Sequence, residues 1–192
     1  MEKDRLVAFS DGVIAVIITI MVLELKAPHD ASLGALREAA PVFLSYVLSF
    51  IYVAIYWNNH HHLFTLVQRV GGGVLWANLH LLFWLSLIPF ATSWLGEHAA
   101  APVPTAIYGV SLLMPAIAYY VLQGVLVRGQ GGSGSALARA LGRDAKGKLS
   151  PLLYVAGILL AFVDTRLSDA IYVLVALMWL IPDRRIERAV QR

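Results

Sequence analysis

Apolar residues are concentrated in four long runs, separated by short polar segments: 6–25, 41–66, 73–95 and 104–127. A helix rises about 1.5 Å per residue, so about 20 apolar residues are needed to cross roughly 30 Å of hydrocarbon. Each of the four runs meets this length and is predicted to be a transmembrane helix. Two shorter runs, 149–163 and 167–181, are joined by a polar turn and predict a helical hairpin. The pattern therefore predicts an all-α membrane protein with six transmembrane helices in one domain.

The composition supports a membrane location and removes several function classes. Of the 192 residues, 59% are hydrophobic and 14% are charged, and the mean hydropathy is +0.71. These values lie outside the range of ordinary soluble domains. Because the chain has no cysteine, it has no disulfide framework, thiolate metal site or catalytic thiol. The first apolar run contains Asp11 and lacks a small-residue cleavage site, so it is not a typical signal peptide.

The basic residues predict the orientation of the six helices. Twelve of the fifteen Lys and Arg residues fall on one side of the membrane if the chain crosses it six times. Such residues accumulate on the cytoplasmic side, so both termini are predicted to be cytoplasmic. The glycine-rich, basic segment 128–148 is predicted to be a mobile cytoplasmic loop with one amphipathic turn lying on anionic lipid, and it gives no indication of nucleic-acid binding.

Polar side chains recur at one depth in the first three predicted helices. Asp11 lies five residues inside the cytoplasmic end of the first, Trp57 to His62 (WNNHHH) lie near the cytoplasmic end of the second, and Asn78 and His80 lie near the start of the third. Unpaired polar groups are costly in hydrocarbon, so these groups are expected to bond to one another and fix how the helices pack.

A metal site formed by the adjacent histidines is the less favoured interpretation. Neighbouring residues of a helix point about 100° apart, so His60, His61 and His62 cannot bind one ion together. No metal ligand is therefore predicted.

One face of the first helix is apolar and almost free of charge. At about 100° per residue, Val16, Thr19 and Leu23 lie within about 60° of one another, and Gly12 extends the same stripe. Asp11 lies about 140° from Val16 and is expected to face the neighbouring helices of its own chain. From the residues alone, the stripe could pack against lipid or against another helix.

The motif Arg-x-x-x-Phe-Ser-Asp, formed by Arg5, Phe9, Ser10 and Asp11, resembles the signature of the transmembrane-protein-175 family of potassium channels. Three further segments are similar to that family in the same order: ITIMVLELKAP, YWNNHHHLF and NLHLLFWLSLIPFATSWLGEH. The resemblance is close over the first three predicted helices and extends to the last three in layout only.

The resemblance implies a homotetramer of six-span units in which the four first helices line a central pore. Carried over by position, Val16 forms an apolar bottleneck, Thr19 a ring of hydroxyls and Leu23 a further apolar ring. The carbonyl filter sequence TVGYG of other potassium channels is absent here. An apolar ring selects by dehydration, so the permeant ion is expected to be K⁺ rather than Na⁺. Valine is shorter than the isoleucine or leucine usual at this position, so weaker selectivity is expected.

The resemblance also implies partners and a location. The expected partners are other copies of the chain, membrane lipid and monovalent cations, with no cofactor, in a bacterial inner membrane. Glu24 would surround the outer mouth and concentrate cations, with Lys26 opposing part of its field. In the family, Arg5, Ser10 and Asp11 are held by polar residues of the second and third helices.

Trp57, Asn78 and either His61 or His62 are the partners predicted here. Headgroup anchoring is the alternative for Arg5, which lies just below the membrane edge.

Two other function classes are less favoured. A proton-coupled secondary transporter could use Asp11 with His61 or His62, but Asp11 is predicted to face away from an axial path and the chain shows no inverted repeat. A membrane hydrolase could use Ser10, Asp11 and His61. However, Ser10 and Asp11 are adjacent on a helix and their side chains diverge, so they cannot form the hydrogen-bonded series of nucleophile, base and orienting residue that a hydrolase needs. The chain is therefore predicted not to be an enzyme.

Overall fold

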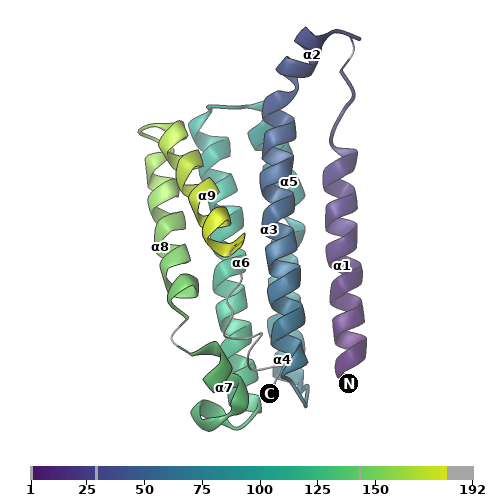
Figure 1. Cartoon of the computed structure of the whole chain (residues 1–192), viewed down its shortest axis with the longest axis vertical. Coiled ribbons are helices and arrows are strands. Elements are labelled where there is room, and N and C mark those ends of the chain that lie inside the picture. The colour runs from purple at the N-terminus through teal and green to yellow at the C-terminus, as the bar shows by residue number, and fades with distance from the viewer. Residues whose placement is uncertain (1, 29, 143, 181–192) are drawn as a thin grey trace.

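A computed structural model describes residues 2–28, 30–142 and 144–180, and within these ranges all regular structure is helical (Figure 1). The elements are α1 Lys3–Leu23, α2 Leu33–Glu38, α3 Ala40–Thr65, α4 Gly72–Ser86, α5 Ile88–Glu97, α6 Pro102–Gly129, the 3₁₀ helix η1 Gly132–Gly134, α7 Ala136–Leu141, α8 Ala145–Leu160 and α9 Thr165–Leu180. The long helices run antiparallel to one another in a bundle (Figure 1).

Four stretches are long and apolar enough to cross a membrane: α1, α3, α4 with α5, and α6. They correspond to the first four predicted helices. The last two, α8 and α9, have 16 residues each. At about 1.5 Å per residue they reach only about 24 Å, less than the hydrocarbon thickness. Six complete spans therefore stay a prediction, and residue 181 of the sixth predicted run lies outside the described residues.

The third predicted helix is broken in two. Leu87 separates α4 from α5, and Pro89 lies in the first turn of α5. Proline has no N–H to donate and its ring clashes with the carbonyl four residues earlier, so it favours a helix start over a helix interior, although Pro115 lies inside the continuous helix α6. The two pieces still form one apolar stretch, Gly72–Glu97.

The segment 128–148 is more ordered than predicted. It contains the end of α6, η1, α7 and the start of α8. Ser135 caps α7 by accepting from the N–H of Ala138 at 3.1 Å, and Asp144 caps α8 by accepting from the N–H of Gly147 at 3.1 Å. Leu137 of α7 is buried in the core. The single amphipathic turn predicted for this segment corresponds to α7, but Leu137 on its apolar side packs into the protein core rather than against lipid.

The helices enclose two clusters of buried side chains. One cluster joins α1, α3, α4, the start of α5, α6 and α7, and the other joins α3, α5, α6, α8 and α9. Figure 1 shows α1 at one edge of the bundle and the α8–α9 hairpin at the opposite edge. Helix α1 packs mainly against α3, α4 and α5, so its remaining surface is not covered by this chain.

Candidate functional site

Helix α1 has one buried face and one exposed face. Its buried residues recur every three or four positions and are Leu6, Ser10, Ile14, Ile17 and Met21. Gly12, Val16, Thr19 and Leu23 all lie on the exposed face. Val16 is 56% exposed and Leu23 is 74% exposed, as are large apolar side chains on other helices, for example Trp76 at 75%. The stripe predicted from helical spacing is thus not covered by any other helix of the described chain.

Thr19 carries the one hydroxyl group in this stripe, and this hydroxyl already donates a hydrogen bond. The Thr19 hydroxyl donates to the backbone carbonyl of Ala15 at 2.9 Å. The lone pairs of this exposed oxygen therefore remain free to accept a hydrogen bond or to contact a cation.

The buried face of α1 is anchored by a chain of hydrogen bonds to α4 and α3. Nδ2 of Asn78 donates to the Ser10 hydroxyl at 2.9 Å, and that hydroxyl donates to the Leu6 carbonyl at 2.9 Å. Oδ1 of Asn78 lies 2.8 Å from Nε2 of His60. Because an amide oxygen only accepts, the ring nitrogen is the donor. All three side chains are at most 1% exposed, so the bonds link three helices in the core.

The histidine in this layer is His60, and the prediction of His61 or His62 is wrong on this point. His60 stacks against Phe64, whose ring centre is 4.5 Å away. His61 is exposed and stacks on Trp57, while His62 is partly buried. Adjacent residues point about 100° apart, so only one of the three can face the core. The spacing of Tyr52, Tyr56 and His60 on the buried face of α3 was the signal that could have identified it.

Asp11 is held nearer the surface than Ser10. Nε1 of Trp57 donates to Oδ1 of Asp11 at 3.0 Å, and Asp11 is half-buried. The carboxylate therefore faces α3, but Ser10 makes the deeper contact.

Arg5 and Phe9, the other residues of the motif, are exposed. Arg5 forms no hydrogen bond or ion pair within the described ranges, in contrast to the contact that the family resemblance implies. His80 also lies outside the buried layer. It is on the exposed side of α4, where its Nε2 accepts a hydrogen bond from Nε1 of Trp84.

The far end of α1 carries the acidic residue predicted at the outer mouth. The Ser93 hydroxyl of α5 donates to Oε2 of Glu24 at 3.3 Å. Lys26 lies 3.9 Å from Glu97 at the end of α5, and both side chains are largely exposed. Lys26 thus pairs with a carboxylate other than Glu24, which weakens the predicted cancellation of the Glu24 field.

Comparisons with known proteins agree with the arrangement around α1. The model of the family described as endosomal/lysosomal potassium channel TMEM175 matches residues 5–89, which contain the anchored helix and its partners on α3 and α4. Potassium channel HX13_20290 of Chryseobacterium sp. is 53% identical over 191 residues, covering 100% of this chain and 99% of that protein. The chain belongs to the TMEM175 family. It is an integral membrane protein with four apolar stretches that are long enough to span the membrane.

Other TMEM175 relatives differ in how much of their length is matched. The crystal structure of a lysosomal potassium-selective channel TMEM175 homolog from Chamaesiphon minutus has a TM-score of 0.80 and 29% identity, over 94% of this chain and 97% of that one. The endosomal/lysosomal proton channel TMEM175 of Homo sapiens is 30% identical over 53% of this chain but only 23% of its own length.

Proposed function

We infer that four copies of the chain form a potassium-selective, or weakly selective, cation channel whose pore is lined by α1. The observation that carries this proposal is the exposed stripe of Gly12, Val16, Thr19 and Leu23, on a helix whose opposite face is bonded into the core. The proposal is supported by relatives that are named potassium channels.

The proposed selection step depends on the cost of removing water from an ion. Four Val16 side chains around an axis form a narrow apolar ring that offers a passing cation no replacement ligands. K⁺ holds its water less tightly than Na⁺, so it crosses such a ring more readily. Thr19, one turn outward, supplies four oxygens whose lone pairs can contact the partly dehydrated ion, and Leu23 forms a second apolar ring.

The proposed topology has six spans, with both termini in the cytoplasm of a bacterial cell and the inner membrane as the host membrane. The antiparallel order of the long helices supports it (Figure 1), as does the excess of Lys and Arg on one side. Glu24 then lies at the outer mouth, where four carboxylates raise the local concentration of cations.

Reconstitution of the purified protein in lipid bilayers tests the proposal. We expect single-channel currents whose reversal potential follows the K⁺ gradient more closely than the Na⁺ gradient, together with a tetramer mass. Transport that is tied to a pH gradient, without channel currents, would instead support the proton-coupled carrier. A monomer without currents would contradict the proposed channel.

A further inference from the structure

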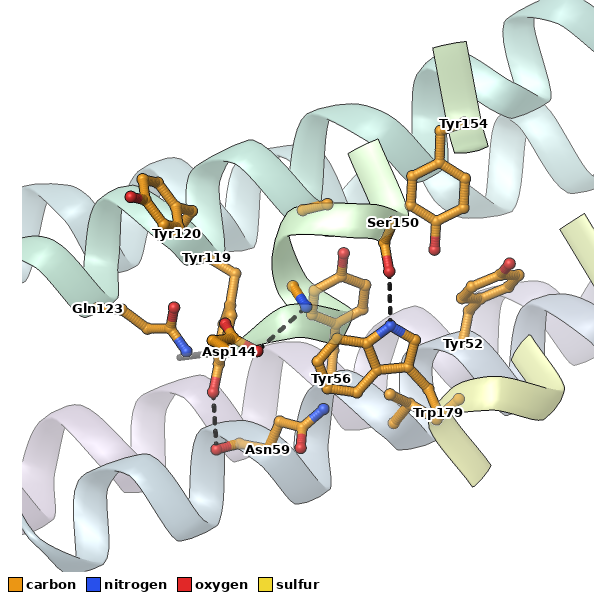
Figure 2. Close-up of a pocket in the computed structure, with 13 residues that line it drawn as sticks. Tyr52, Tyr56, Asn59, Tyr119, Tyr120, Gln123, Asp144, Ser150, Tyr154 and Trp179 are labelled. Carbon is orange, nitrogen blue, oxygen red and sulfur yellow. Dashed lines mark hydrogen bonds between the residues drawn. The ribbon is translucent and has the colours of Figure 1, made fainter. Parts of the chain in front are cut away.

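A second site lies far from the exposed face of α1. A partly open cavity of about 40 Å³ lies between α3, α6, α8 and α9 (Figure 2). We call it the tyrosine cavity, after five of its lining residues: Tyr52, Tyr56, Tyr119, Tyr120 and Tyr154. Trp179, Asn59, Gln123 and Asp144 also line it.

The polar groups of several of these aromatic side chains already donate hydrogen bonds to other parts of the chain. The Tyr119 hydroxyl donates to the Asn59 carbonyl at 3.1 Å, and Nε1 of Trp179 donates to the Ser150 hydroxyl at 2.8 Å. The Tyr52 hydroxyl donates to the carbonyl of Tyr172. What these residues offer the cavity is therefore aromatic ring surface, which attracts cations through its negative face.

Three polar groups around the cavity have unused hydrogen-bonding capacity. Tyr56 is only 9% exposed, yet its hydroxyl forms no hydrogen bond within the described part of the chain. Figure 2 shows Tyr56 rising from α3 toward the first turn of α8. Oδ1 of Asp144 caps that turn, which leaves its other carboxylate oxygen. The side-chain amide of Asn59 likewise makes no hydrogen bond within residues 2–28, 30–142 and 144–180.

The electrostatics of the cavity favour a cation. Among the described residues that line it, Asp144 is the one that carries a charge, and it is half-buried. The N-terminus of α8 offsets only about half an elementary charge. Nζ of Lys146 donates to the carbonyl of Met178, and Lys146 does not line the cavity. A negative charge thus lies beside aromatic rings and oxygen atoms that form no hydrogen bond within the described residues.

We propose that the tyrosine cavity binds a primary ammonium group. The –NH₃⁺ head carries three N–H donors, whereas a trimethylammonium head has none and cannot use the free oxygen acceptors of this cavity. Its three donors match the Asp144 carboxylate, the Tyr56 hydroxyl and the Asn59 amide oxygen. The proposal does not depend on ion conduction.

The position of the cavity allows two sources for this group. Asn59 and Gln123 each lie six residues before the ends of α3 and α6, or about 9 Å along the helix. This depth is within reach of an ethanolamine lipid headgroup from the nearby membrane surface. A free alkylamine carries the same chemistry.

Calorimetric titration of the purified protein in detergent with n-butylamine tests the site. We expect saturable binding, and choline is expected to bind about tenfold or more weakly because its quaternary head has no N–H to donate. The Asp144→Asn variant keeps an oxygen that can cap α8, but it loses the charge. Loss of a charged hydrogen bond predicts about ten- to a hundredfold weaker butylamine binding.

The matched control is Asp164→Asn, which alters another turn-capping carboxylate that does not line the cavity. It should leave butylamine affinity unchanged. Tyr56→Phe removes only a hydroxyl and should also weaken binding. Equal binding of choline, or unchanged affinity in Asp144→Asn and Tyr56→Phe, would overturn the proposal.

Native mass spectrometry from bilayers with equal amounts of dioleoyl phosphatidylethanolamine and phosphatidylcholine separates the two sources. Selective retention of the ethanolamine lipid, lost in Asp144→Asn, identifies the lipid headgroup as the ligand. Butylamine binding without lipid selectivity identifies a free amine. If neither butylamine nor the ethanolamine lipid binds, the site does not recognise ammonium groups.

Discussion

Asn78→Ala is the sharpest test of how α1 is anchored. Asn78 is 1% exposed and holds two interhelical hydrogen bonds, one from His60 of α3 and one to Ser10 of α1. Alanine removes both bonds. It also leaves Nε2 of His60 unpaired, and Nδ1 of the same ring already lacks a partner within the described residues.

The expected loss of stability follows from the two bonds. Interhelical hydrogen bonds in membrane proteins contribute about 0.6 kcal/mol on average and at most about 1.7 kcal/mol. The two bonds of Asn78 therefore predict a decrease of about 1–3 kcal/mol in the free energy of unfolding. Ser10→Ala removes only one of them and should cost about half as much.

Reversible unfolding by sodium dodecyl sulfate in mixed micelles measures these free energies. The matched control is Asn58→Ala, the same change on the exposed side of α3, which should alter the free energy by less than about 0.5 kcal/mol. Equal effects of Asn78→Ala and Asn58→Ala would refute the anchoring role of the buried layer.

Three further predictions concern the pore and the α8–α9 hairpin. Val16→Ala should widen the bottleneck and lower the K⁺ over Na⁺ permeability ratio in bilayer recordings; an unchanged ratio would remove Val16 from the selecting ring. Glu24→Gln should reduce inward K⁺ conductance at low ionic strength but not at about 1 M salt, where charges are screened within about 3 Å; a loss that is independent of salt would contradict an electrostatic role. Gly157→Ala should lower the unfolding free energy by about 1–3 kcal/mol, because the added Cβ would lie 2.5 Å from Cε1 of Tyr172. Gly124→Ala, where no atom lies within 4 Å, should be neutral or stabilising, and equal effects of the two changes would contradict this packing.

The long helices could be predicted from the sequence because run length alone decides whether a segment can cross a membrane. The break at Leu87 was missed, although Pro89 was a visible signal for it. Only one helical turn was predicted in 128–148, because the glycine-rich composition hid the caps supplied by Ser135 and Asp144.

The candidate site was predictable in part. Depth along the helices correctly brought Trp57 to Asp11 and placed Asn78 in the same layer, beside Ser10, because distance along a helix follows directly from residue number. To choose His60, one must know which face of α3 is buried. The spacing of the buried tyrosines Tyr52 and Tyr56 indicates that face. The direction of His80 could not be predicted, because it depends on which face of α4 is covered by α1, a property of the tertiary packing.

A cysteine at position 16 tests the central claim, that α1 lines a pore at Val16. The natural chain has no cysteine, so Val16→Cys introduces a single reactive thiol. The matched control is Val22→Cys, which is also on the exposed surface of α1 but about 120° away by helical rotation. We predict that a water-soluble methanethiosulfonate reagent blocks the K⁺ current of Val16→Cys and leaves Val22→Cys unaffected. A Val16→Cys current that persists after the reagent has been shown by mass spectrometry to modify the thiol would contradict the account.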